Sequence, residues 1–177
     1  CTAAGGEFAE RDSKGCGSLL TEAVARDDRR SKYQEIGAHP YRSNAMKFTW
    51  FNLMPWPYLP DDFREQNRSV WVDIPSTLYD PRRGHHVYHE YMDQLEYAES
   101  LGFDGIGVNE HHQNGYGLMP SPNIIAAGLA RRTSKAALCV IGNSIALYNP
   151  PIRVAEEFAM LDVLSGGRLV AGFPVGT

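Results

Sequence analysis

The residues of this sequence best suited to chemistry are Glu110, His111 and His112, which follow Asn109 at the end of a short apolar run at 105–108. A carboxylate and two imidazoles can exchange protons near neutral pH, and all three are common metal ligands. Consecutive residues that leave a strand point in different directions, so one site cannot use all three. Their spacing also lacks the H-x-H and HExxH patterns of zinc sites. We therefore choose His111 as the candidate general acid or base, while a metal site that pairs Glu110 or a histidine with ligands on other strands, and a histidine that only packs in its loop, stay open.

Polar or small residues also follow the other apolar runs, at points where the chain would leave a strand. The strand ends deliver Phe51, Asn52 and Met54 at the first strand, Asn143, Ser144, Tyr148 and Asn149 at the third, and Pro174, Gly176 and Thr177 at the fourth. In a β/α barrel, the carboxyl ends of the parallel strands carry the active site. We therefore expect all these residues to lie around the site of His111.

Hydrophobic periodicity predicts alternating strands and helices from Met46 onward. The predicted strands are 48–53, 104–108, 137–142 and 168–173, and the predicted helices are 85–101, 121–133 and a third from Pro151 to Ser165. In the third helix, Val154, Phe158, Leu161 and Leu164 are expected to share the buried face. This alternation is typical of parallel βαβ units.

The segment 54–84 is predicted to be a long irregular loop rich in proline. Loops of this length inside a compact domain are uncommon and often functional. Its aromatic residues are Trp56, Tyr58, Phe63 and Trp71. They either cover an apolar substrate pocket or anchor the loop to the rest of the fold.

The glycine pattern favours a barrel over a doubly wound sheet. No G-x-G-x-x-G loop follows the first strand, and no phosphate-binding P-loop is present. A complete barrel takes about 250 residues, whereas 177 − 45 = 132 residues run from Met46 to the last residue. We predict an α/β chain of the (β/α)8 TIM-barrel family with about the first four βα units in 46–177. Residues 1–45 are interpreted as a disordered or foreign leader.

Composition excludes several classes of partner. The net charge is −4, which argues against a basic face for nucleic acid, and no apolar run reaches the length of a membrane span. No secretory signal is visible, and the cysteines form no C-x-x-C pair. A cytoplasmic protein is the expectation that fits these features.

Two segments of the sequence resemble one enzyme family. The first is 109–123, Asn-Glu-His-His-Gln-Asn-Gly-Tyr-Gly-Leu-Met-Pro-Ser-Pro-Asn, and the second is 151–157 followed by 161–168. They are similar to the segments after the second strand, and around the third helix and fourth strand, of the bacterial luciferase-like, flavin-dependent monooxygenases. The resemblance covers about residues 46–177 and none of 1–45.

This resemblance implies a barrel that binds reduced FMN, or in some branches a deazaflavin, and uses O2 to oxidise a small organic substrate. It places His111 beside the flavin ring, where it assists proton transfer, and matches Glu110 to the family's acid or to a residue that holds the loop. It assigns cofactor contacts to Asn52, to Gly142, Asn143 and Ser144, and to Gly176 and Thr177. It also implies a non-proline cis peptide near Asn143–Ser144.

The partners implied by the resemblance are the organic substrate, O2 and a separate flavin reductase, and the full-length protein is expected to form a homo-oligomer. The phosphate-holding residues of the family lie in later strands, so the 177-residue chain alone is expected to bind FMN weakly and to be inactive. Three alternatives stay open: a metal-dependent TIM-barrel hydrolase that uses Glu110, His111 and His112, a non-catalytic flavin-binding relative, and a histidine that merely packs in its loop.

Overall fold

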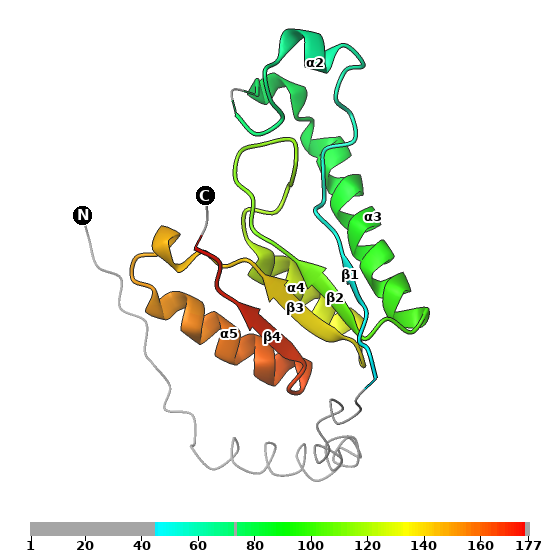
Figure 1. The fold of residues 1–177 in the computed structure, drawn as a ribbon, viewed down its shortest axis with the longest axis vertical. Coiled ribbons are helices and arrows are strands. Elements are labelled where there is room, and N and C mark those ends of the chain that lie inside the picture. The colour runs from blue at the N-terminus through cyan, green and yellow to red at the C-terminus, as the bar shows by residue number, and fades with distance from the viewer. Residues whose placement is uncertain (1–44, 73, 176–177) are drawn as a thin grey trace, which may run out of the picture. The chain divides into compact units, whose positions relative to one another are not determined.

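The computed structural model describes residues 45–72 and 74–175 (Figure 1). Apart from Ala45, the predicted leader falls outside the described residues, as do Gly176 and Thr177. The strands are β1 (Thr49–Phe51), β2 (Gly105–Val108), β3 (Ala137–Ile141) and β4 (Leu169–Gly172). The helices are α2 (Phe63–Gln66), α3 (Pro81–Ser100), α4 (Pro122–Arg132) and α5 (Ile152–Ser165), with single 3-10 turns η2 (Ser76–Leu78) and η3 (Ile145–Leu147).

The four strands form one parallel sheet in the sequential order β1-β2-β3-β4 (Figure 1). Helices α3, α4 and α5 connect successive strands, as the sequence predicts for βαβ units. A doubly wound sheet reverses its strand order at a switch point, and no reversal occurs in the described sheet. The sequential order is that of neighbouring strands in a β/α barrel.

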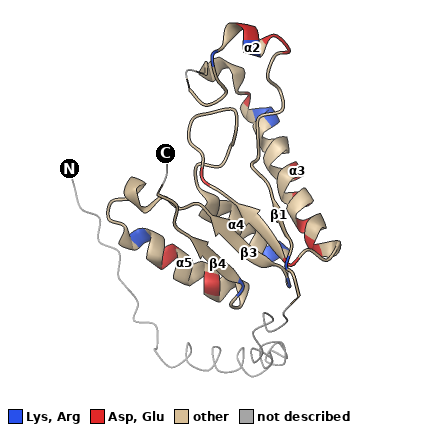
Figure 2. Cartoon of the chain, viewed as in Figure 1, with Lys and Arg blue, Asp and Glu red and all other residues tan. Residues whose placement is uncertain are grey.

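One face of the sheet packs on the helices and forms the core. Ile106, Val108, Leu138 and Val140 alternate along β2 and β3, and each is at most 2% exposed. They pack with helix residues such as Leu95, Leu129, Phe158 and Leu161. The strands contain no charged residue, so charge lies on the helices and loops (Figure 2). The buried face thus fixes the register that brings the strand ends together.

Arg168 joins the ends of α4 and α5 to the start of β4. Its Nε donates to the carbonyl oxygen of Ser165 at 2.8 Å, and its Nη1 donates to that of Ala136 at 2.7 Å. Its Nη2 donates to the carbonyl oxygens of Thr133 and Ala130 at 3.0 and 3.2 Å. These acceptors include carbonyls at the end of α4, where a cation also suits the helix dipole. The buried guanidinium therefore stabilises the end of the sheet at which β3 and β4 begin.

The helices and strands differ from the predictions in three respects. Helix α3 begins at Pro81 rather than His85, because Asp80 caps it by accepting from the backbone N–H of Arg82 at 2.8 Å. The strands are one to three residues shorter than predicted. Leu164 is 55% exposed, and Ser165 takes the buried position instead. Within the described residues, no helix has the length and apolar character needed to cross a bilayer.

Candidate active site

The carboxyl ends of β2 and β3 bring two predicted site segments together. Glu110 follows β2, Ser144 follows β3, and the backbone N–H of Ser144 donates to Glu110 Oε2 at 3.0 Å. This bond depends on the parallel pairing of the two strands, which ends at Val108 and Val140. The structure therefore places these two predicted residues at one site.

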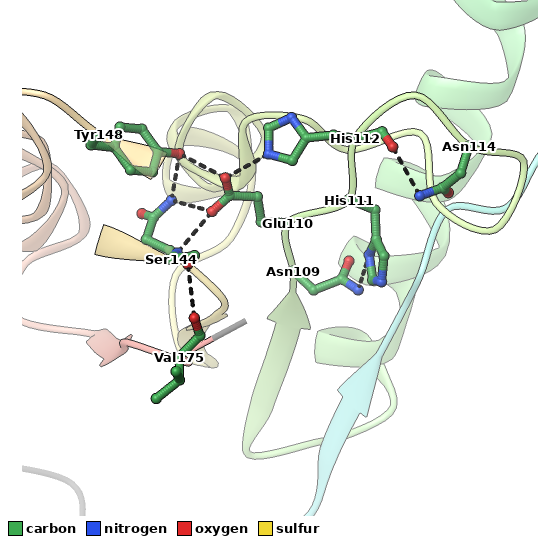
Figure 3. A network of polar contacts seen from close by, with 9 residues as sticks. Asn109, Glu110, His111, His112, Asn114, Ser144, Tyr148 and Val175 are labelled. Atoms are coloured by element: carbon green, nitrogen blue, oxygen red, sulfur yellow. Dashed lines mark hydrogen bonds and ion pairs between the residues drawn. The ribbon is translucent and has the colours of Figure 1, made fainter. Parts of the chain in front are cut away.

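Glu110 is the centre of a buried polar cluster (Figure 3). Its side chain is 4% exposed. Its Oε1 lies 2.7 Å from His112 Nε2 and accepts from the Tyr148 hydroxyl at 3.3 Å. Its Oε2 accepts from Ser144 N and, at 3.4 Å, from Asn143 Nδ2. Both carboxylate oxygens are thus occupied by donors that tie the loop after β2 to the loop after β3.

Tyr148, one of the polar residues expected at the end of the third strand, belongs to the site, although it is not among the residues assigned a catalytic or cofactor-binding role. Burial, followed by the charge of Glu110, raises the pKa of Tyr148 to about 12. The hydroxyl therefore keeps its proton and donates it to Glu110, while it accepts from Asn143 Nδ2 at 3.0 Å. Its place after the third strand is visible in the sequence, but its contact with Glu110 is not, because that contact depends on how the third strand ends.

His111 points away from this cluster (Figure 3). Its Nδ1 accepts from Asn109 Nδ2 at 2.7 Å, so the hydrogen of the neutral ring lies on Nε2. The ring centroid lies 5.2 Å from both Trp71 and Tyr116, which stack on each other at 4.1 Å. Burial, together with the charge of His112, lowers the pKa of His111, although Glu110 opposes this shift. His111 is therefore a neutral imidazole near pH 7.

The side chains of Glu110, His111 and His112 point to two different places, as expected for consecutive residues that leave a strand. His112 pairs with Glu110, whereas His111 pairs with Asn109 and the aromatic rings. Successive side chains alternate in direction as they leave β2. Glu110 therefore does not orient the His111 ring through a direct hydrogen bond. It holds the loop on which His111 lies.

Gly117 determines how closely the loop approaches His111. A Cβ atom at position 117 would lie 2.9 Å from the Cβ and Cγ atoms of His111, a distance that real Cβ atoms do not reach. The backbone N–H of His111 also donates to the carbonyl oxygen of Met119 at 3.0 Å. The imidazole is thus held against the backbone of its own loop, which requires glycine at this position.

A cavity of about 720 Å3 lies beside His111, between the segment 56–79 and the loop after β2. Its described lining contains no Lys, Arg, Asp or Glu. The lining residues are Trp56, Leu59, Ile74, Pro75, Ser76, Leu78, Tyr79, Tyr88, His111, Gln113, Asn114, Gly115, Gly117, Leu118 and Pro120. The long proline-rich segment therefore forms one wall of the cavity. It is also anchored to the loop after β2, since the backbone N–H of Trp56 donates to Gly115 O at 2.9 Å.

The remaining predicted cofactor residues have different surroundings. Asn52 is buried and its amide is already bonded, since Nδ2 donates to Gln94 Oε1 at 3.1 Å and Oδ1 accepts from Met54 N at 2.8 Å. Gly142 has a φ of 144°, which strongly favours glycine. The predicted cis peptide near Asn143 is wrong, because within the described residues the cis bond precedes Pro150.

Two buried amide oxygens at this end of the sheet have no hydrogen-bond partner, Asn109 Oδ1 and Asn143 Oδ1. An unpaired buried acceptor is costly, so each is a natural contact for a ligand N–H or O–H. Within 45–72 and 74–175, no group of three or more His, Cys, Asp or Glu side chains is arranged to hold a metal ion.

Comparisons with known proteins connect this geometry to a family. A family model for luciferase-like monooxygenases matches residues 71–176. The alkanal monooxygenase beta chain of Vibrio harveyi is 34% identical over 92 residues, which cover 52% of this chain and 28% of that protein. The oxygenase component of the flavin-dependent trigonelline monooxygenase of Acinetobacter baylyi is 33% identical over 90 residues, covering 51% and 25%.

A solved structure extends the likeness to the fold. The oxygenating constituent of 3,6-diketocamphane monooxygenase from Pseudomonas putida, in complex with FMN, superimposes with a TM-score of 0.55 at 18% identity. The match covers 75% of this chain and 30% of that one. The predicted α/β fold of the TIM-barrel family is confirmed. The chain spans less than a third of the length of these relatives.

Proposed function

The chain belongs to the luciferase-like monooxygenase family, as its resemblance predicts, and from this we propose that the full-length protein is a flavin-dependent monooxygenase. It would use reduced FMN and O2 to oxidise a small organic molecule, so that one oxygen atom enters the substrate and the other leaves as water. The observation that carries the proposal is the placement of His111 at a strand exit, where its Nδ1 accepts from Asn109 Nδ2 and its side chain lines a cavity.

The donor and acceptor set at the strand ends fits a flavin ring. The oxidised isoalloxazine has a single ring N–H, and it matches an acceptor such as the free Oδ1 of Asn109 or Asn143. In this proposal, Gly142 and Ser144 contribute backbone beside the ring, whereas Asn52 positions the loop after β1 through Met54 N. Gly176 and Thr177 remain predicted contacts, because they lie outside the described residues.

When bound, the reduced flavin supplies the two electrons that the reaction with O2 requires. The chain's own residues do other work. His111 holds a proton on Nε2 and offers it as a hydrogen-bond donor, because Asn109 occupies Nδ1. The aromatic rings of Trp71 and Tyr116 exclude water from one side of this imidazole. The role of Glu110 is to hold the loop after β2 against the loop after β3.

FMN is proposed over a deazaflavin because the fold neighbour from Pseudomonas putida is described in complex with FMN. A separate reductase is proposed by analogy with the trigonelline enzyme, whose matching chain is described as an oxygenase component. A homo-oligomer stays a prediction.

The proposal is tested by titrating the full-length protein with FMN and with 3-methyl-FMN, which lacks the ring N–H, and following flavin fluorescence. We expect FMN to bind and the methylated analogue to bind about tenfold more weakly, because a buried neutral hydrogen bond contributes about 1 kcal/mol and avoids an unpaired group.

Replacement of Lys47, an exposed residue paired with Asp104, provides a matched control, and Lys47→Met should leave both affinities unchanged. Failure of the full-length protein to bind FMN would contradict the proposal. Tighter binding of a deazaflavin than of FMN would keep the family assignment but overturn the choice of cofactor.

A further inference from the structure

Three histidines lie near the start of helix α3, at positions 85, 86 and 89. Their side chains are exposed, and the lining of the cavity beside His111 includes none of them. The proposed monooxygenase chemistry therefore leaves these three imidazoles unexplained.

The spacing of His85 and His89 is that of a helical metal-binding pair. Residues four apart lie one turn from each other on the same side of a helix, and two histidines at this spacing bind zinc together in helical zinc sites. His86 follows His85 directly, so it points about 100° away around the helix axis. The spacing therefore favours His85 and His89 as the pair.

The two rings already have the separation that a shared metal ion requires. Their centroids lie 4.7 Å apart, at an interplanar angle of 66°. A Zn–N bond of about 2.0–2.1 Å and an N–Zn–N angle of about 90–110° place two imidazole centroids roughly 4.5–5.2 Å apart. The centroids of His85 and His86 lie 5.4 Å apart, outside this range. A metal ion can therefore join His85 and His89 through small rotations of two exposed side chains.

The charges near this pair are balanced. Both histidines lie beyond the first turn of α3, where the positive end of the helix dipole has little effect. The Cζ atom of Arg83 lies 4.8 Å from the ring centroid of Tyr58, and its Nε lies 3.9 Å from Asp80 Oδ2, so its charge is directed to those groups. Arg82 precedes the pair and Glu90 follows it, so that their opposite charges offset each other.

We propose that His85 and His89 bind one divalent transition-metal ion of the class that imidazole prefers, such as Zn2+, with water completing its coordination. Within the described residues, no third His, Cys, Asp or Glu joins the pair in a larger metal group, so the ion is exchangeable rather than permanently held. The bound ion fixes the turn of α3 that also carries Tyr88, which lines the cavity. This inference goes beyond the proposed monooxygenase and does not depend on it.

Isothermal titration calorimetry of the full-length protein with Zn2+, and with Mg2+ for comparison, tests this site. We expect Zn2+ to bind to the pair and Mg2+ not to bind there, because Mg2+ prefers oxygen ligands. His85→Gln and His89→Gln should each weaken Zn2+ binding at least about tenfold, since even the loss of a residue that orients a metal ligand has an effect of this size. His86→Gln is the matched control, because it replaces an exposed histidine of the same helix and should leave the affinity unchanged.

NMR of the wild-type protein gives a second measurement that needs no variant. Zn2+ should shift the ring signals of His85 and His89 together, with the same dependence on its concentration, whereas the ring signal of His86 should change less. The shifts should disappear as the pH is lowered, because imidazole binds a metal ion only in its neutral form.

Absence of Zn2+ binding, or ring shifts confined to other histidines, would overturn the inference. Zn2+ binding that is unchanged in both His85→Gln and His89→Gln would also overturn it. An equal loss in His86→Gln would overturn the choice of the pair, and equal binding of Mg2+ would indicate a general attraction of cations instead. Because these titrations contain no flavin or O2, their result is judged separately from the proposed function.

Discussion

His111 is kept neutral by its surroundings, and this can be measured at the single residue. Burial and the charge of His112 lower its pKa below the ordinary value of 6.5, while Glu110 acts in the opposite direction. We expect the ring carbon of His111, followed by NMR during a pH titration, to show a midpoint below 6.5. A lowered pKa favours the neutral ring, in which Nε2 carries the hydrogen and can donate it.

The same titration in His112→Gln separates burial from charge. Removing the positive charge of His112 relieves repulsion, so the midpoint of His111 should move upward. An unchanged midpoint would mean that the charge of His112 does not contribute to the lowered pKa of His111. A wild-type midpoint above 6.5 would contradict the placement of His111 in its aromatic surroundings.

Glu110 is expected to contribute more to stability than to proton transfer. Its two oxygens accept from donors on opposite sides, so Glu110→Gln places an NH2 group against other donors on at least one side. We expect this variant to lose about 1–3 kcal/mol of unfolding free energy, because a buried donor is left unpaired. Tyr148→Phe, which removes a single hydroxyl, should lose about 1 kcal/mol.

Chemical denaturation with urea measures both losses. If Glu110→Gln is as stable as the wild-type protein, then the polar cluster does not hold the loops together. If Tyr148→Phe costs more than Glu110→Gln, then the tyrosine rather than the carboxylate is the centre of the cluster.

Residue type and position along the chain are enough to indicate part of this site. Glu110, His111 and His112 stand out because ionisable side chains follow an apolar run. The sequence predicts that these side chains point in different directions, but not which residues they contact. The contacts come from distant segments, since Tyr148 follows the third strand and Trp71 lies before α3. The contact of Tyr148 with Glu110 joins residues 38 positions apart and leaves no local pattern.

Helix α3 fixes the loop between α4 and β3 through Glu99. Its carboxylate accepts from the backbone N–H groups of Ser134, Lys135 and Ala136, at 2.9, 2.8 and 2.6 Å. Burial raises the pKa of Glu99, but these three hydrogen bonds and the charge of Arg168 together lower it below 4.5. This anchor sets the position at which β3 enters the sheet.

The lowered pKa predicts how stability depends on pH. A carboxyl group with a lower pKa in the folded state stabilises the fold above its unfolded value of about 4.5, and this contribution disappears as pH falls through the folded value. We expect Glu99→Gln to be less stable than the wild-type protein at pH 7 and the difference to shrink below pH 4.5. Urea unfolding at several pH values checks this, and a constant difference would contradict it.

Elements are predicted well where the pattern is local. The spacing of apolar residues predicts the parallel strands and the helices between them, because β2, β3 and the helices α3, α4 and α5 each place an apolar face on the same core. The predicted start of α3 at His85 is four residues late, although Asp80 and Pro81 form a common start signal just ahead of the histidines. The bonds of the buried Arg168 cannot be predicted, since its acceptors are carbonyls of two other segments.

At the scale of the molecule, the sheet leaves its second face exposed among the described residues. Phe51, Ile141 and Val170 lie on the strands opposite the helix-covered face and are 44–51% exposed. The order of the strands follows from the sequence, because short βαβ connections place successive strands side by side. The cavity cannot be predicted from the sequence in the same way. Its walls combine residues of the segment after β1 with residues of the loop after β2, which are far apart in the sequence.

The account as a whole requires that oxygen from O2 enters an organic product at a site that depends on His111. The most direct measurement supplies the full-length protein with reduced FMN, a panel of small organic compounds and 18O2, and follows the label by mass spectrometry. We expect one 18O atom in each product molecule, and a loss of about 100-fold or more in the labelling rate in His111→Gln, the range for a general acid or base. Reoxidation of the flavin without label in any organic product, or equal labelling by His111→Gln, would contradict the account.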